Sequence, residues 1–316
     1  MHGALLKFHR MREEPAISFG LLKRYFLLGK IQNEGQSAGY TVNVFSVSSE
    51  TIRETFILKD KIFIDWFIGF TEGCGRFIVS KEGELEFKII QPSEDAQILF
   101  YIKKRLGFGT VRVQDKNNKT HCFKVKNREG LFKLIFIFNN NLYLESRKEE
   151  FKNWLFAYNK LYIQEILYIK SNRKPSLDDY WLSGFSDAIG CFTCSILYHS
   201  KEGKSIAPLV RLKYLLWSGK NSVENFKLME HLAEILGGKT HYIENYNGYC
   251  TAINRTKLTK TIRYFKLHPL KTHKSIIYLN WYKIYKLVNN KQHLTVWGLN
   301  KIKTYQKTID RLSKKI

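Results

Sequence analysis

The chain has 316 residues, of which 44% are hydrophobic, so it can bury a core, which argues against global disorder. Its 52 Lys and Arg residues outnumber 28 Asp and Glu residues, which gives a formal net charge of +24 at pH 7. Self-repulsion of this size destabilises a compact chain, so a polyanionic partner is predicted. Nucleic acid is the first candidate and an anionic membrane surface the second. A soluble basic protein without such a partner is the alternative.

No segment reaches the roughly 18 to 20 apolar residues that a membrane-spanning helix needs, so a membrane protein is not predicted. Residues 1–30 lack a clean apolar run and a small-residue cleavage site, which makes them a poor secretory signal and a weak transit peptide. Lys, Ile, Asn, Phe and Tyr are abundant and Pro is rare. This bias is typical of an AT-rich genome, so the mitochondrion or another organelle is the expected location.

The five cysteines are an odd set without a secretory signal, which is typical of reduced thiols. Cys191 and Cys194 form a CxxC motif within an apparent strand. A zinc site would need a second pair of ligands at suitable spacing, and none is found. We therefore expect these two cysteines to have a packing role.

Two segments of the chain resemble each other, with Gly69 and Gly184 at matching positions. The first is DWFIGFTEGCGRF (residues 65–77) and the second is YWLSGFSDAIGCF (residues 180–192). Trp, Gly, Phe, an acid, Gly and Phe recur in register. The chain is therefore predicted to contain a duplicated unit.

The segments that follow each motif predict the same order of elements, which gives αββαββα per unit. In the first copy the predicted elements are strands at 76–81 and 84–91, a helix at 95–106, strands at 110–114 and 121–126, and a helix at 129–138. In the second copy they are strands at 191–200 and 206–217, a helix at 223–236, a hairpin across 246–248, and a helix at 257–265.

Three parts lie outside the duplicated units: an extension at the N-terminus, a helix and linker between the copies, and two C-terminal helices. They are predicted at 1–58, at 148–169 with 171–176, and at 275–288 with 295–312. The predicted domains are thus an N-terminal extension (1–58), a first repeat with its linker helix (59–170) and a second repeat with the C-terminal helices (171–316). The predicted fold class is α+β, with two pseudo-symmetric repeats forming a saddle of antiparallel sheets.

Alternating residues in the predicted strands place cations on one sheet face. Val111 and Val113 are expected to face the helices, as are Phe123 and Val125, while their neighbours face outward. The outward residues predicted to contact nucleic acid are Lys88, Arg112, Gln114, Lys124, Lys126, Arg211, Lys213 and Lys239. An ordinary solvated face is the alternative, and Glu84 and Glu86 beside Lys88 argue against phosphate contact at that place.

Small residues four positions apart mark the interface predicted between the two motif helices. They are Gly69 and Gly73 in the first helix and Gly184 and Ala188 in the second. This spacing lets two helix backbones approach closely, so the helices are expected to pack against each other. Gly75 and Gly190 are expected to end them, with the two C-terminal ends side by side.

The two motifs resemble degenerate LAGLIDADG motifs, and the segments PLKTHK (269–274) and KQHLTVWGL (291–299) resemble segments of fungal mitochondrial single-chain members of that family. The resemblance covers about residues 60–312. It implies the fold described above, and it implies binding of long DNA sites with metal-dependent cleavage of both strands. It also allows a maturase role, in which a member helps group I intron RNA to fold and splice.

The resemblance also implies a metal-binding acid just before the final glycine of each motif, and these positions hold Cys74 and Ile189. Isoleucine cannot bind metal, and a thiolate is a poor ligand for Mg²⁺. Glu72 and Asp187 lie two positions earlier, about 200° around the helix, so they are expected to point away from the site. Metal binding would remain possible if the Glu72 side chain reoriented at a frayed helix end. Lys271 and Lys274 could supply charge near a phosphate, or they could be ordinary surface lysines.

The leading interpretation is a cleavage-impaired, monomeric binder of structured intron RNA that acts in mRNA splicing, with no confident cofactor. The alternative is an active homing endonuclease, which would use Mg²⁺ to cut double-stranded DNA in intron homing. A structural subunit of a ribonucleoprotein and a reading frame without selected function are two further possibilities.

Overall fold

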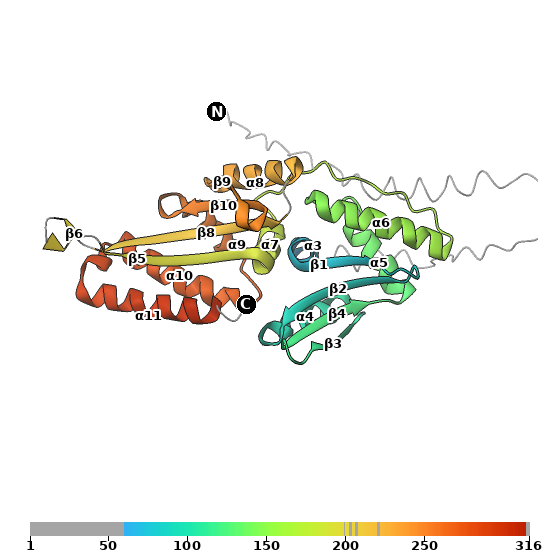
Figure 1. Cartoon of the computed structure of the whole chain (residues 1–316), viewed down its shortest axis with the longest axis horizontal. Helices are drawn as coiled ribbons and strands as arrows, with labels where there is room; N and C mark the ends of the chain where they lie inside the picture. Colours follow the sequence, from blue (N-terminus) through green and yellow to red (C-terminus); the bar gives the residue numbers. More distant parts are fainter. Residues whose placement is uncertain (1–59, 199, 202–203, 206–207, 220–221, 314–316) are drawn as a thin grey trace, which may run out of the picture. The chain divides into compact units, whose positions relative to one another are not determined.

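The computed structural model describes residues 60–313, except 199, 202–203, 206–207 and 220–221 (Figure 1). The predicted N-terminal extension at 1–58 lies outside the described residues. None of the helices in the described part of the chain combines the length and apolar character that crossing a bilayer requires.

The first repeat contains one antiparallel sheet in the strand order β1-β2-β4-β3. Its elements are α3 (Lys61–Cys74), β1 (Gly75–Val79), β2 (Leu85–Pro92), η1 (Ser93–Asp95), α4 (Ala96–Leu106), β3 (Thr110–Asp115), β4 (Thr120–Val125) and α5 (Arg128–Phe138).

The second repeat has the same arrangement, with the strand order β5-β8-β10-β9. Its elements are α7 (Trp181–Ile189), β5 (Gly190–Leu197), β8 (Leu209–Gly219), α8 (Val223–Leu236), β9 (Lys239–Ile243), η2 (Glu244–Tyr246), β10 (Gly248–Asn254), η3 (Arg255–Lys257) and α9 (Thr259–Leu267). A small hairpin of β6 (Ser200–Lys201) and β7 (Lys204–Ser205) extends from its long strands. The prediction of an α+β fold built from two αββαββα units is confirmed.

One face of each sheet carries the aromatic core of its repeat. In the first sheet Phe77, Phe87 and Phe123 are buried, and the Phe77 and Phe87 rings lie 5.1 and 5.5 Å from the ring of Phe138 in α5. Alternation along the strand places every second residue on this face. The other face, the outer face, carries Glu86 and Lys88, and it also carries the exposed apolar side chains of Ile78 and Ile90.

The edge strand β3 departs from the predicted alternation. Val113 is 51% exposed, although it was expected to face the helices. The pairing of β3 with β4 shifts register between Val113 and Asp115, as at a β-bulge. Val113 still pairs in register with His121, so it keeps the face of Val111, and its exposed side chain lies at the end of the regular part of this edge strand.

The helix between the repeats is shorter than predicted and starts earlier. α6 spans Glu145–Tyr162, and Ile163 adopts a left-handed conformation with φ of 51°. The Asn159 side chain pairs with both backbone groups of Ile166, at 2.8 and 3.3 Å. These bonds turn the chain back at the helix end, so the apolar residues up to 169 continue as an irregular segment.

The C-terminal helices are α10 (Lys274–Asn289) and α11 (Val296–Ser313), with η4 (Gln292–Leu294) between them. They pack together and lie along the edge strand β5 (Figure 1).

The CxxC cysteines lie on opposite faces of β5, because they are three residues apart in a strand. Cys194 packs partly against the core, whereas Cys191 is exposed on the outer face. The expected packing role was therefore wrong for Cys191. Within the described residues, no group of three or more His, Cys, Asp or Glu side chains could hold a metal ion.

The two repeats meet through α3 and α7, whose backbones touch. A Cβ atom on Gly184 would collide with the carbonyl oxygen of Trp66 and would lie 2.8 Å from the amide nitrogen of Phe70. A Cβ atom on Gly69 would meet the backbone of Trp181 and Phe185 in the same way. Only glycine allows this approach at either position, because the neighbouring atoms belong to backbone and cannot move aside cheaply.

We expect Gly184→Ala to lower the free energy of unfolding by about 2 kcal/mol or more, because the added methyl group forces the helices apart. Gly219→Ala is the matched control, since its Cβ atom would meet only the Tyr246 hydroxyl oxygen at 3.9 Å. Its effect should stay within about 0.5 kcal/mol. Urea denaturation measures both values. Equal effects of the two substitutions would contradict the close crossing.

Candidate functional site at the paired helix ends

Each motif helix binds the acid of the other helix through its tryptophan. The Trp66 indole Nε1 donates to Asp187 Oδ2 at 2.8 Å, and the Trp181 indole Nε1 donates to Glu72 Oε2 at 2.6 Å. All four side chains are buried, with at most 3% of any residue exposed. The recurrence of Trp and an acid six residues apart in both motifs therefore encodes a reciprocal pair of bonds between the repeats.

The same two acids hold the loops that close their own repeats. Glu72 Oε1 accepts hydrogen bonds from the backbone nitrogens of Tyr143 and Leu144, at 2.7 and 2.5 Å. Asp187 accepts from the backbone nitrogens of Lys271 and Thr272, at 2.8 and 3.1 Å. The two loops are thus equivalent in structure, although the first has lost the sequence pattern of the second.

The Thr272 hydroxyl adds a further bond to Asp187 Oδ1 at 2.6 Å. Burial raises the pKa of Asp187 above its usual value and raises the pKa of Glu72 to about 7, although their hydrogen bonds oppose the shift. Glu72 has three hydrogen bonds and Asp187 four, which hold both side chains against the loops. In this arrangement they have a structural role and do not reach toward the helix ends.

The helix ends themselves carry a thiol and an alkyl group. The Cys74 thiol donates to the Phe70 carbonyl oxygen at 3.2 Å, and burial raises its pKa to about 12, so it stays protonated at neutral pH. Ile189 is half-buried and lies beside Gly73 of the facing helix. Gly75 and Gly190 end the two helices as predicted.

Two cations cap these helix ends. Lys274 Nζ donates to the carbonyl oxygens of Ala188 and Ser186 in α7, at 3.0 and 3.4 Å. Arg147 Nε donates to the Glu72 carbonyl oxygen in α3 at 3.0 Å. Carbonyl groups at a helix C-terminus lack partners within the helix, and cations suit the negative end of its dipole. Lys274 is only 6% exposed, so the expectation of an ordinary surface lysine was wrong.

This set of groups does not fit Mg²⁺, the ion that the resemblance implies. Mg²⁺ needs oxygen ligands, usually one or two carboxylates with waters. The helix ends offer a protonated thiol, an alkyl side chain and two capping cations, and the nearest acids are held by the loops. The positive charge of Lys274 would also repel a divalent cation.

Lys271 lies beside the interface and among aromatic rings. Its Nζ atom is 6.0, 5.5 and 5.8 Å from the ring centres of Trp66, Tyr101 and Tyr180. Desolvation lowers its pKa below the usual value. Cation–π attraction of this kind fixes the ammonium group, so Lys271 is not an ordinary solvated lysine either.

The predicted nucleic-acid residues of the first repeat lie on its outer face, but two of them have acidic partners. Lys126 pairs with Glu84 and Glu86 at 3.3 and 3.6 Å, and Lys124 pairs with Glu86 at 3.6 Å. Arg112 and Gln114 are exposed on β3, and Lys88 is half-buried between Arg76 and Lys124 in the strand register.

In the second repeat Arg211, Lys213 and Lys239 are all exposed. Within the described residues none of the three forms an ion pair with an acid. This outer face therefore offers more uncompensated positive charge than that of the first repeat.

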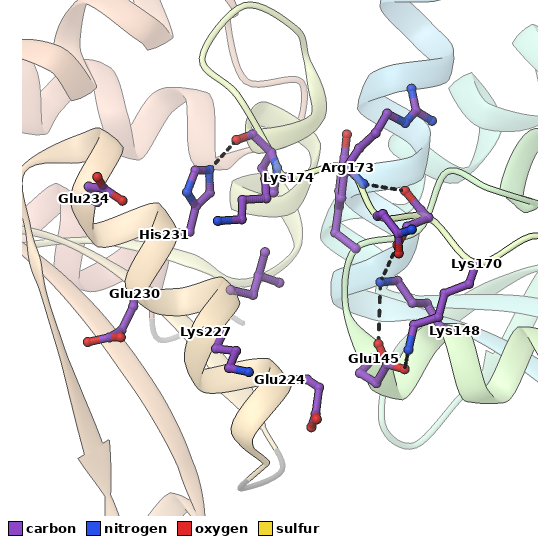
Figure 2. Close-up of a pocket in the computed structure, with 15 residues that line it drawn as sticks. Glu145, Lys148, Lys170, Arg173, Lys174, Glu224, Lys227, Glu230, His231 and Glu234 are labelled. Atoms are coloured by element: carbon purple, nitrogen blue, oxygen red, sulfur yellow. Dashed lines mark hydrogen bonds and ion pairs between the residues drawn. The ribbon is translucent and has the colours of Figure 1, made fainter. Parts of the chain in front are cut away.

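A cleft of about 680 Å³ lies between the irregular linker and α8, and Figure 2 shows its charged lining. Lys148 and Lys170 both pair with Glu145 there, at 3.5 and 2.7 Å. Glu224, Glu230 and Glu234 of α8 add negative charge. Because its charges are mixed, the cleft is a poor site for a polyanion.

Sequence reasoning did not find Arg147 or the pair of Asp95 with His273. The His273 imidazole Nδ1 contacts the Asp95 carboxylate, and its backbone nitrogen donates to Asp95 Oδ1 at 3.1 Å. This pair links η1 of the first repeat to the closing loop of the second. No local signal marks it, since the two residues are 178 positions apart.

The raised pKa of Glu72 predicts a dependence of stability on pH. Because the folded-state pKa of about 7 exceeds the unfolded value of 4.5, folding favours the protonated form. The contribution of Glu72 is greatest below pH 4.5 and decreases as pH rises to about 7, by on the order of 3 kcal/mol.

Urea unfolding of the wild type and Glu72→Gln between pH 4.5 and 7.5 measures this decrease. As pH rises, the wild type should lose stability relative to Glu72→Gln. The unfolding free energy of the wild type minus that of the variant should therefore decrease. A difference that is constant over this range would show that Glu72 titrates normally.

Two stretches of the chain, residues 67–158 and 182–285, match the model of the LAGLIDADG endonuclease family. The chain is 52% identical to a Neurospora crassa protein named probable intron-encoded endonuclease 4. That match covers 98% of this chain and 54% of the relative, so the chain spans about half of the relative's length. It is also 28% identical to the intron-encoded RNA maturase bI4 of Saccharomyces cerevisiae, over 74% of this chain and 35% of the maturase.

Among solved structures, the LAGLIDADG meganuclease I-AabMI bound to uncleaved DNA is similar, with a TM-score of 0.64 and 22% identity. The similarity covers 77% of this chain and 98% of that chain, and it shows a shared fold. Since the family model matches both repeats and more than half of the residues, the chain belongs to the LAGLIDADG endonuclease family.

Proposed function

We propose that this chain is an intron-associated protein that binds nucleic acid without cutting it, and that its partner is structured group I intron RNA. In this role it acts in splicing, as maturases do. The chain is proposed to work in the mitochondrion as a monomer with an internal pseudo-two-fold axis. The composition bias of the sequence supports the location.

The observation that carries the proposal is the chemistry of the paired helix ends. Hydrolysis of a phosphodiester at these ends would need carboxylates to hold a metal ion that activates water and neutralises the leaving oxygen. Cys74 and Ile189 supply neither, and the hydrogen bonds of Glu72 and Asp187 hold these acids elsewhere. What the chain retains is the two-repeat scaffold and the net charge of +24.

An active homing endonuclease is the second candidate, because the Neurospora relative is named a probable endonuclease and I-AabMI was solved on DNA. The relative named an RNA maturase favours the first candidate. The two functions differ in one measurable property, which is metal-dependent cleavage.

We expect the purified chain to bind its intron RNA with strong salt dependence and to leave duplex DNA of the intron insertion site uncut in Mg²⁺ or Mn²⁺. Gel-shift and cleavage assays on one preparation test both properties. Cleavage of that duplex in Mg²⁺ or Mn²⁺ would establish the endonuclease function instead. RNA binding no tighter than to an unrelated transcript would refute the maturase function.

The outer faces of the two sheets should contribute unequally to binding. Removing both charges in Arg211→Gln/Lys213→Gln should weaken binding and make the slope of log K against log salt less steep by about 1.4 to 1.8, since each phosphate contact contributes about 0.7 to 0.9.

Lys124→Gln/Lys126→Gln removes the same net charge but frees Glu84 and Glu86 of their partners. Because those lysines are already partly neutralised, its slope should change by less than about 1. Equal slope changes in the two double variants would contradict the assignment of the second repeat as the stronger contact surface.

A further inference from the structure

Apart from the cations of the outer sheet faces, positive charge is concentrated in the C-terminal part of the sequence. Residues 245–309 include 13 Lys and Arg residues and no Asp or Glu residue. Soluble protein surfaces usually mix both signs. The cations of such a stretch repel one another, and a bound polyanion would reduce this repulsion.

Helix α9 presents part of this charge as an ordered stripe. Thr261, Tyr264 and Phe265 form its buried face. The cations on its exposed side follow one another at intervals of three residues, continuing from η3; they are Lys257, Lys260, Arg263 and Lys266. Residues three apart are neighbours on a helix surface. We call these four residues the α9 stripe.

The charge of the α9 stripe is uncompensated, unlike that of the matching helix in the first repeat. Within the described residues no acid forms an ion pair with any of the four cations. In α5, which occupies the same place in the first repeat, Lys133 pairs with Glu129 at 2.6 Å. The duplicated fold therefore does not require a cationic stripe at this helix.

The α9 stripe points away from the outer face of its sheet. Phe265 packs on the rings of Phe192 and Tyr214, at 5.5 and 5.4 Å, and both rings belong to the buried face of that sheet. Arg211 and Lys213 lie on the opposite face of the same sheet. The α9 stripe and these two cations are therefore on opposite sides of the second repeat.

We propose that the α9 stripe is a second nucleic-acid-binding surface, and that it contacts the phosphates of a folded RNA that reaches both sides of the second repeat. The inference rests on the proposed function, because it assigns a further part of the same RNA to this helix. Duplex DNA on the outer sheet faces does not reach the stripe.

The shapes of the two nucleic acids favour RNA at this surface. Duplex DNA has a persistence length of about 50 nm, so a short target site stays nearly straight and touches one side of a protein of this size. A folded intron RNA contains several helices joined by single-stranded segments, which present phosphates in different directions. Only such a partner can occupy the outer face and the α9 stripe together.

The test compares two variants of equal net charge in the full chain. The first is Lys257→Gln/Lys260→Gln/Arg263→Gln/Lys266→Gln, which removes the stripe. The second is Lys103→Gln/Lys104→Gln/Lys152→Gln/Lys160→Gln, which removes four lysines from α4 and α6. Affinities are measured for a folded group I intron transcript and for a straight 40-base-pair duplex, over a range of salt concentrations.

We expect loss of the stripe to weaken RNA binding about tenfold or more at 0.15 M salt, and to make the salt slope less steep by about 3. Its effect on the duplex should be less than about twofold, and the α4 and α6 variant should change RNA binding far less. Lys257→Arg/Lys260→Arg/Lys266→Arg keeps the charge and should bind RNA like the wild type. Circular dichroism and thermal unfolding check that every variant folds.

The outcomes separate this inference from the proposed function. If the wild type binds neither nucleic acid, the proposed function itself fails. If the wild type binds RNA and loss of the stripe has no effect, or weakens RNA and duplex binding equally, only the second surface is refuted. The same holds if loss of the stripe abolishes binding to anionic phospholipid vesicles and leaves RNA binding intact.

Discussion

Two tryptophan side chains reach across the contact between the repeats, and each donates a hydrogen bond to a buried acid of the other motif helix. The bonds can form because Gly69 and Gly184 let the backbones of α3 and α7 touch. The same acids hold the loops after α5 and α9. One buried network of hydrogen bonds thus fixes the helix crossing, the loops and the helix ends. Loss of one member would leave buried donors or acceptors without partners.

Within each motif, the acid that belongs to this network and the position where the family resemblance implies a metal ligand are different residues. Glu72 and Asp187 form the hydrogen bonds that hold the helix crossing and the loops, whereas Cys74 and Ile189 lie at the helix ends and form none of these bonds. A chain can therefore lose metal ligands at the helix ends and still keep its scaffold. At the helix ends themselves, Arg147 and Lys274 bind the free carbonyl groups.

The repeat, its αββαββα order and the close packing of the motif helices could be predicted from the sequence, because they follow from local periodicity and from small residues in register. The exposure of Val113 and the end of α6 could not, since they depend on the position of Val113 at the end of an edge strand and on the Asn159 side-chain bonds. The roles of Arg147 and Asp95 depend on contacts over 75 and 178 positions, which no spacing rule reveals. The sequence showed Glu84 and Glu86 on the same face, but only the structure shows that they pair with Lys124 and Lys126.

The side chains at the paired helix ends imply that these ends bind no divalent metal. Titration of the nucleic-acid complex with Mn²⁺, followed by electron paramagnetic resonance, tests it most directly. We expect the protein to add no bound Mn²⁺ to the number that the free nucleic acid binds. One or two additional Mn²⁺ ions per chain would contradict it.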